Sequence, residues 1–270
     1  MSVLISADEL ASAPDDVVLL DVRWKLGGPS GRPEYLKGHI PGAMYVDLET
    51  ELAAHGAPTD GRHPLPPLVK LQEAARRWGV RHDRPVVVYD DWMNMAAARA
   101  WWLLRWAGVE DVRILDGALG AWTGPLETDD VVPEPSDIEL RPGGRPTLEL
   151  DEVAAFAQRG VLLDARAAER FRGEVEPIDP KAGHIPGARS APTTENLGPD
   201  GRFLAPDALR ERFAALGADG SQPVGVYCGS GVSAAHEIFA LELAGVDAAL
   251  YGGSWSQWSH HDLPVAVGDD

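Results

Sequence analysis

The chain has 270 residues, of which 44% are hydrophobic and 24% are charged, with one cysteine and a formal net charge of −18. This length fits two domains of about 130 residues each, and a single cysteine excludes an intrachain disulfide. The acidic balance predicts neither nucleic acid nor an anionic membrane as a partner, because non-specific binding to either depends largely on positively charged side chains of the protein.

The beginning of the chain gives no targeting signal. Residues 1–10 lack a basic start and a long apolar stretch, and no apolar run is long enough to span a bilayer. We therefore expect a reduced, cytoplasmic protein. The apolar content is adequate for a core without a metal, and His260 and His261 have no further ligand nearby, so we expect neither a metal nor a cofactor.

The predicted elements alternate between short strands and helices. Ser6 and Glu9 form a capping box that begins a short helix, and a strand follows at residues 17–22. Further elements are expected as strands at residues 86–89 and 224–227 and as helices at residues 71–78, 96–107, 207–216 and 233–244. This alternation predicts an α/β fold with a parallel sheet covered by helices.

Segments of the first half of the chain recur in the second half in the same order. The matched pairs are Val18–Arg23 with Val161–Arg166, Gly38–Ala43 with Gly183–Ala188, and Val86–Tyr89 with Val224–Tyr227. We predict two tandem copies of one α/β unit. The copies span residues 1–128 and 147–270, and a linker rich in Pro and Gly joins them at residues 129–146.

The repeat separates residues that serve the fold from candidates for chemistry. A residue present in both copies is expected to be structural, because only one copy carries a nucleophile. We assign these shared residues to the fold: His39 and His184, and the ion pairs Asp21/Arg23 and Asp164/Arg166.

Cys228 lies in a Gly-rich turn between a predicted strand and a predicted helix. Backbone N–H groups of such a turn and the positive end of the helix can converge on the sulfur. This setting favours the thiolate, which is the nucleophilic form, over the alternative of an inert buried cysteine. The first copy has Asp90 at this position, so only the second copy can use a thiol.

Cysteine phosphatases use the same strand–turn–helix arrangement. They need an arginine after the five residues that follow the cysteine, because its guanidinium binds the phosphoryl oxygens. Position 234 is Ala, and residues 229–233 carry no cation. Phosphate is therefore a poor ligand for this turn.

The sequence Cys-Gly-Ser-Gly-Val-Ser-Ala at residues 228–234 resembles the active-site loop of the rhodanese-type sulfurtransferases. It is similar to the Cys-Gly-Ser/Thr-Gly-Val-Thr form of mercaptopyruvate sulfurtransferases, with Ser233 in place of Thr, whereas thiosulfate sulfurtransferases tend to have Cys-Arg-Lys-Gly-Val-Thr. The resemblance covers essentially the whole chain. It implies two rhodanese-like domains, sulfane-sulfur transfer through a persulfide of Cys228, and substrate binding by Gly229, Gly231, Val232 and Ser233.

Arg170 is a candidate for substrate binding. Its counterpart in the first copy is Gly27, so the fold does not require an arginine there. It resembles the family arginine that binds the carboxylate or sulfonate of the donor, and a guanidinium suits a carboxylate. Mercaptopyruvate enzymes usually have a second arginine after a Glu-Pro pair, where this chain has Ile178.

Asp47 and His63 occur only in the first copy, and their counterparts in the second copy are Pro192 and Phe203. They resemble the residues that mercaptopyruvate sulfurtransferases bring across the domain interface toward the loop serine, here Ser230. The resemblance implies that His63 exchanges a proton through Ser230 and that Asp47 fixes the tautomer of His63.

These observations predict a two-domain sulfurtransferase that takes sulfur from 3-mercaptopyruvate, a small anionic donor. The persulfide would pass its sulfur to cyanide or to a thiol, which could belong to a thioredoxin-like protein. Two alternatives stay open at this stage. One is a thiosulfate sulfurtransferase, and the other is a persulfide carrier or binding module with little turnover.

Overall fold

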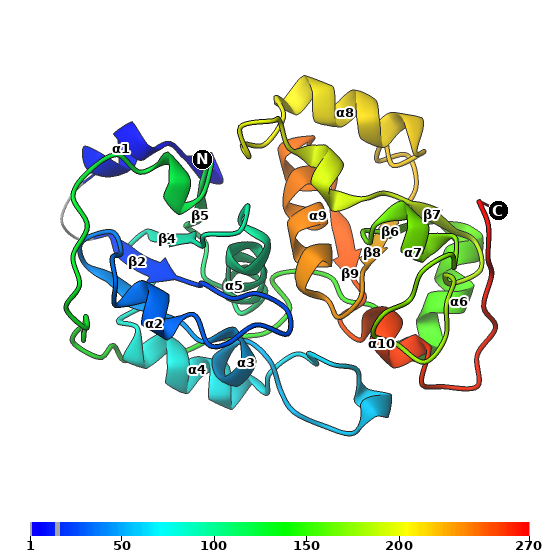
Figure 1. Cartoon of the computed structure of the whole chain (residues 1–270), viewed down its shortest axis with the longest axis horizontal. Coiled ribbons are helices and arrows are strands. Elements are labelled where there is room, and N and C mark those ends of the chain that lie inside the picture. The colour runs from blue at the N-terminus through cyan, green and yellow to red at the C-terminus, as the bar shows by residue number, and fades with distance from the viewer. Residues whose placement is uncertain (1, 14–16, 270) are drawn as a thin grey trace. The chain divides into compact units, whose positions relative to one another are not determined.

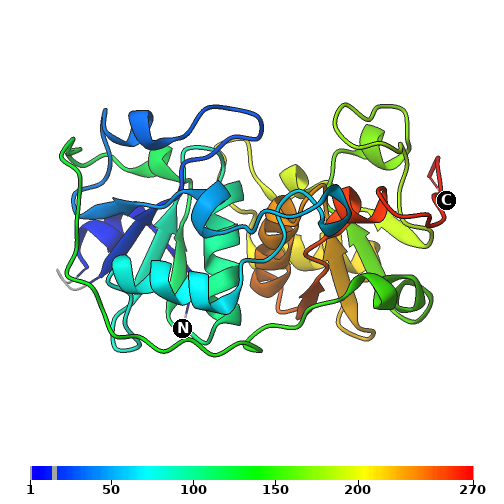
Figure 2. The ribbon, with the colours of Figure 1, turned by 90° about the horizontal axis from the view of Figure 1, so that it is seen from below.

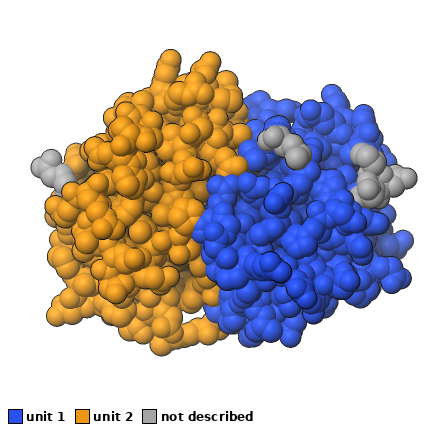
Figure 3. Space-filling model, turned by 180° about the vertical axis from the view of Figure 1, so that it is seen from behind, with its two compact units in different colours: residues 1–54, 66–145, 199–202 blue, residues 55–65, 146–198, 203–270 orange. Residues whose placement is uncertain are grey.

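The computed structural model describes residues 2–13 and 17–269, and Figure 1 shows it as a ribbon. Contacts divide the chain into two compact units, which Figure 3 distinguishes by colour. The first unit comprises residues 1–54, 66–145 and 199–202, and the second comprises residues 55–65, 146–198 and 203–270.

The two units do not follow the order of the chain at every point. Residues 55–65, which belong to the first copy of the repeat, are grouped with the second unit. Within that unit, the short helix η1 (Pro58–Asp60) packs against α10 (Ser254–Trp258) (Figure 2). The domain limits drawn from the repeat, 1–128 and 147–270 with a linker at 129–146, stay a prediction.

The first unit contains a five-stranded parallel sheet in the order β1-β5-β4-β2-β3. In chain order the strands are β1 (Leu4–Ile5), β2 (Val18–Asp21), β3 (Ala43–Tyr45), β4 (Val86–Tyr89) and β5 (Val112–Leu115). The helices are α1 (Ala7–Ala11), α2 (Arg32–Tyr35), α3 (Leu48–Glu51), α4 (Leu68–Arg77), α5 (Met95–Trp106) and the 3₁₀ helix η2 (Leu119–Ala121). Helix α1 begins at the predicted capping box, where Ser6 accepts a hydrogen bond from the N–H of Glu9.

The second unit contains a four-stranded parallel sheet in the order β7-β6-β8-β9. Its strands are β6 (Val161–Asp164), β7 (Ala188–Ser190), β8 (Val224–Tyr227) and β9 (Ala248–Leu250). Besides η1 and α10, its helices are α6 (Leu150–Arg159), α7 (Ala168–Phe171), η3 (Thr193–Asn196), α8 (Pro206–Ala215) and α9 (Val232–Leu243). The order repeats β3-β2-β4-β5 of the first sheet, which confirms the predicted α/β fold with two parallel sheets flanked by helices.

The burial of the central strands shows that each sheet is covered on both faces. All four residues of β4 and of β8 are buried, as expected for parallel strands between two layers of helices. Helix α9 lies on one side of the second sheet and α6 on the other (Figure 1). Gly225 of β8 allows Phe156 of α6 and Leu148, which precedes α6, to approach closely, because a Cβ at this position would lie 2.8 Å from both side chains.

The shared residues make the same contacts in both units. His39 and His184 place Nδ1 at 2.9 and 2.8 Å from the carbonyls of Tyr35 and Phe171. The ion pairs Arg23–Asp21 and Arg166–Asp164 both have an N–O distance of 2.6 Å and are buried. These equivalent contacts support the assignment of the shared residues to the fold.

No helix within residues 2–13 and 17–269 is long and apolar enough to span a membrane.

Candidate active site

Cys228 directly follows β8, and the turn at residues 229–231 leads into α9, a twelve-residue helix. Gly231 has a φ of 80°, in the left-handed region that glycine adopts without strain. This conformation lets the N–H of Gly231 donate a hydrogen bond to Cys228 Sγ at 3.2 Å. The cysteine is only 2% exposed, so little of its surface is open to a reaction partner.

The start of α10 holds the backbone of this turn in place. The N–H of Cys228 donates to Ser254 Oγ at 3.1 Å, and the N–H groups of Trp255 and Ser256 donate to the carbonyls of Cys228 and Gly229 at 2.9 Å. Ser254 itself has a φ of 55°, a conformation that costs free energy for a residue with a Cβ. This concentration of contacts fixes the backbone around the sulfur.

The remaining loop residues predicted to bind substrate lie where the helix begins. Val232 and Ser233 are the first residues of α9, and the first N–H groups of a helix have no partner within it. These groups and the positive end of the helix favour an anion. Together with the N–H of Gly231, they can stabilise negative charge on a sulfur at this turn.

The equivalent turn of the first unit surrounds the side chain of Asp90. Asp90 takes the place of Cys228, and its carboxylate accepts hydrogen bonds of 2.7–3.2 Å from four backbone N–H groups, those of Trp92, Asn94, Ala96 and Ala97. Burial nevertheless raises the pKa of Asp90 to about 6. In the first unit, this turn therefore surrounds a carboxylate that belongs to the chain itself.

Ser230 and His63 lie together in the second unit. His63 Nδ1 is 2.7 Å from Ser230 Oγ, and both residues are buried. Gly61 makes this approach possible, because it has a φ of 90° and a Cβ there would lie 2.9 Å from the carbonyl oxygen of Gly253. An imidazole at this distance can exchange a proton with the serine hydroxyl.

Asp47 lies in the first unit as the N-cap residue of α3. Its Oδ1 accepts hydrogen bonds from the N–H and the Oγ1 of Thr50, both at 3.1 Å. The sequence of this segment therefore accounts for Asp47 as a helix cap. Its predicted action on the tautomer of His63 stays a prediction.

Arg170 lies near the turn, at the C-terminal end of α7. Glu176 accepts hydrogen bonds from its Nε and Nη2 at 3.3 and 2.7 Å, and Asp179 accepts from Nη2 at 3.3 Å. These acids hold one edge of the guanidinium, and Nη1 lies on the opposite side, 3.5 Å from where a Cβ on Gly229 would be.

Arg62 is a further cation at this turn that the sequence reasoning missed. Its Nη1 donates to Asp179 Oδ1 at 2.7 Å, and its backbone N–H donates to Ser256 Oγ at 3.0 Å. Its Nη2 lies 3.2 Å from the Cβ position of Gly229. Its place directly before His63 was the available signal, since one segment carries both residues to the turn.

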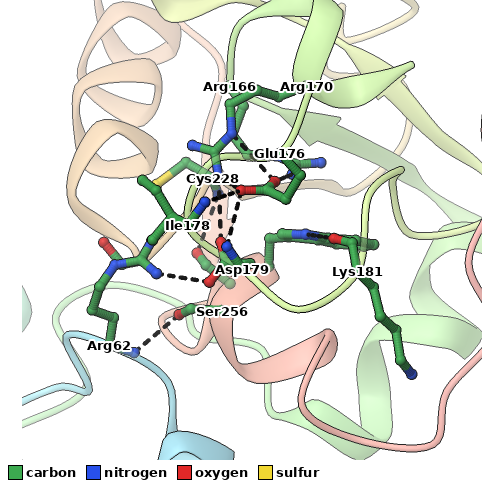
Figure 4. A network of polar contacts seen from close by, with 12 residues as sticks. Arg62, Arg166, Arg170, Glu176, Ile178, Asp179, Lys181, Cys228 and Ser256 are labelled. Atoms are coloured by element: carbon green, nitrogen blue, oxygen red, sulfur yellow. Dashed lines mark hydrogen bonds and ion pairs between the residues drawn. The ribbon is translucent and has the colours of Figure 1, made fainter. Parts of the chain in front are cut away.

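The ion pairs beside Cys228 form one continuous network (Figure 4). Arg166 extends it beyond Arg170, since Arg166 Nη1 lies 3.3 Å from Glu176 and Arg166 Nη2 lies 2.6 Å from Asp164. Asp179 extends it in the other direction, to Arg62. The side chains of Glu176 and Asp179 are buried, while one guanidinium nitrogen of Arg62 and one of Arg170 lie next to Gly229.

The described residues offer no ligand set for a metal. Residues 2–13 and 17–269 contain no group of three His, Cys, Asp or Glu side chains that could hold an ion. His260 and His261 instead approach backbone carbonyls, those of Ser256 at 2.6 Å and Thr59 at 3.0 Å.

Comparison with known proteins identifies related sequences and structures. The model of the family described as rhodanese-like domain matches residues 6–125 and 149–261. A putative thiosulfate sulfurtransferase, SseB of Mycobacterium tuberculosis strain H37Rv, is 51% identical over 95% of this chain and 94% of its own length. A probable 3-mercaptopyruvate sulfurtransferase of Pseudomonas aeruginosa is 48% identical over 98% of both chains.

A solved structure resembles most of the chain. The crystal structure of SseA from Escherichia coli, described as a 3-mercaptopyruvate sulfotransferase with the rhodanese fold, matches with a TM-score of 0.85 and 34% identity. The match covers 94% of this chain and 99% of that chain.

Proposed function

The chain belongs to the rhodanese family, and on that premise we propose that it is a sulfurtransferase in which Cys228 carries the transferred sulfur as a persulfide. The observation that carries the proposal is the turn around Cys228. It points a backbone N–H at the sulfur, at the start of a helix, in the fold position where the other copy has the side chain of Asp90, held by backbone N–H groups.

We propose 3-mercaptopyruvate as the donor. The Cys228 thiolate attacks the donor sulfur, so an S–S bond forms while the C–S bond breaks, and the electron pair of that bond leaves on carbon as the enolate of pyruvate. The enolate takes up one proton to become pyruvate. Because Cys228 is 2% exposed, a small donor that carries its sulfur at the end of a short CH₂ arm is favoured over a bulky one.

Ser230 and His63 supply the proton in this proposal. Ser230 Oγ lies 2.7 Å from His63 Nδ1, and it follows Cys228 by two positions in the same turn. A serine hydroxyl next to the departing enolate can hand over its proton while the imidazole replenishes it. The uncharged loop, Gly229-Ser230-Gly231, leaves this role to a hydroxyl and to backbone N–H groups.

The second half of the reaction returns the enzyme to its starting state. Cyanide or a thiolate attacks the outer sulfur of the persulfide, a new bond to that sulfur forms, and the S–S electron pair returns to Cys228 as a thiolate. The products are thiocyanate or a new persulfide. A protein thiol that protrudes, as in thioredoxin-like proteins, is the acceptor class we propose, and a reducing cytoplasm is the setting in which such thiols stay available.

Thiosulfate is the second candidate donor. It is favoured by the 51% identity to a protein named as a putative thiosulfate sulfurtransferase and by Ile178 at the position of the second arginine. Thiosulfate leaves as sulfite and requires no proton from Ser230.

Steady-state assays with both donors test the proposal. With cyanide as acceptor, we expect a higher kcat/KM for 3-mercaptopyruvate than for thiosulfate, and pyruvate should form in equal amount to thiocyanate. A higher kcat/KM for thiosulfate would assign the protein to the second candidate. No turnover with either donor would contradict the proposed enzyme.

A further inference from the structure

We propose that Arg62 binds the carboxylate of the sulfur donor together with Arg170, a role that rests on the function proposed above. The donor carboxylate would lie over Gly229, between Arg62 Nη2 and Arg170 Nη1. Arg62 thereby becomes a specificity-determining residue for an anionic donor, contributed by the segment that also carries His63.

The two arginines present their unused nitrogens toward the same place. Arg62 uses Nη1 for its hydrogen bond to Asp179. Its Nε is buried and has no hydrogen-bond partner among the described residues. Arg170 uses Nε and Nη2 for Glu176 and Asp179, which leaves Nη1. The remaining nitrogens, Arg62 Nη2 and Arg170 Nη1, lie 3.2 and 3.5 Å from the Cβ position of Gly229.

Asp179 sets the distance between these two arginines. Its Oδ1 accepts from Arg62 at 2.7 Å, its Oδ2 lies 3.3 Å from Arg170 Nη2, and its side chain is 1% exposed. One buried carboxylate therefore orients both guanidinium groups before the donor arrives. Guanidinium groups that are already oriented lose little conformational entropy when a ligand binds, which increases the affinity for a ligand that fits them.

The absence of a side chain at Gly229 keeps the space between the arginines open. A Cβ would lie within contact distance of both guanidinium groups, so a larger residue would occupy the place of the carboxylate. Gly229 immediately follows Cys228 in the chain. One small donor molecule can therefore place its carboxylate over Gly229 and its sulfur at Cys228.

Ile178 does not provide a cation to this region, although its neighbour Glu176 is part of the network. The N–H of Ile178 donates to Glu176 Oε1 at 3.1 Å, and its side chain is exposed. The second positive charge next to Gly229 therefore comes from Arg62, which belongs to a different segment of the second unit.

The test is the KM of the Arg62→Met variant for 3-mercaptopyruvate with cyanide as acceptor. Loss of a hydrogen-bonded contact to a charged group should raise KM by about 10- to 100-fold with kcat nearly unchanged. Arg170→Met should behave in the same way. Arg172→Met is the matched control, because Arg172 forms a comparable ion pair with Glu174 on the surface, and its KM should equal that of the wild type.

A second variant guards against a folding defect, since Arg62→Met leaves Asp179 with one partner fewer. Arg62→Lys keeps a cation for Asp179 but cannot also reach over Gly229, so its KM should also rise. Circular dichroism and full persulfide formation at saturating donor would show that the site is intact. Wild-type KM in both Arg62 variants, with an active wild type, overturns this inference alone. A wild type that forms no persulfide with 3-mercaptopyruvate overturns the proposed function together with it.

Discussion

His63 Nδ1 lies 2.7 Å from Ser230 Oγ, although 167 positions separate the two residues in the chain. Residues 55–65 pack with the second unit, and Gly61 allows the chain to pass close to Gly253. A buried imidazole held against a serine beside the nucleophile is an arrangement for proton transfer.

Replacing His63 should therefore affect the two donors differently. We expect His63→Ala to slow 3-mercaptopyruvate turnover by roughly 10²–10⁴, because the enolate needs a proton, and to change thiosulfate turnover little. His55→Ala is the control, since His55 is exposed in the same segment. Equal losses with both donors would indicate a packing defect, and no loss with either would exclude His63 from the chemistry.

Asp47 allows its two suggested roles to be separated. As the N-cap of α3, it should contribute about 1 kcal/mol to the free energy of unfolding, and Asp47→Ala should lose this. Asp47→Ser keeps a capping oxygen and should retain the stability. If Asp47 also orients His63, both variants should slow 3-mercaptopyruvate turnover, whereas normal turnover in Asp47→Ser would restrict Asp47 to the helix cap.

Asp90 should make the stability of the protein depend on pH. The pKa of this carboxyl is 3.8 in the unfolded reference and about 6 in the fold, so between these values the native state holds a proton that the unfolded chain has released. The free energy of unfolding should therefore fall as the pH rises from about 4 to about 6.

Denaturant titrations of the wild type and of Asp90→Asn at several pH values measure this effect. The amide side chain of the variant does not titrate, so the wild type should lose stability relative to the variant across this window. A difference between the two proteins that does not change with pH would show that the Asp90 carboxyl has the same pKa in both states.

The positions of the central strands and helices could be predicted from the sequence, because the two copies of the repeat show the same pattern twice. Strands β4 and β8 and helices α5 and α9 lie within a residue or two of their predicted positions. The Gly-rich turn at Cys228 could be recognised because strand–turn–helix geometry is local. Asp90 at the same place pointed to the asymmetry between the copies.

The same comparison of copies concealed Arg62. Gly61-Arg62 in the first copy matches Gly201-Arg202 in the second, so a test that seeks differences between copies assigns both arginines to the fold. In the structure Arg202 lies in the first unit near Asp116, at 4.0 Å, and Asp200, at 3.7 Å, whereas Arg62 faces Gly229. Long-range placement of a loop side chain depends on tertiary contacts that local sequence does not encode.

The ion network had no local signature either. Glu176 and Asp179 orient Arg170 through contacts within a short loop, but their burial depends on packing around the turn. Arg170 itself was found because its counterpart is Gly27 and because it resembles the family arginine that binds the donor.

Mass spectrometry of the intact protein tests the central claim most directly. After incubation with 3-mercaptopyruvate and no acceptor, the wild type should gain the mass of one sulfur atom, and cyanide should remove it as thiocyanate, while Cys228→Ser should gain nothing. Sulfur uptake by Cys228→Ser, or a wild type that releases pyruvate without ever carrying the added sulfur, would contradict the account.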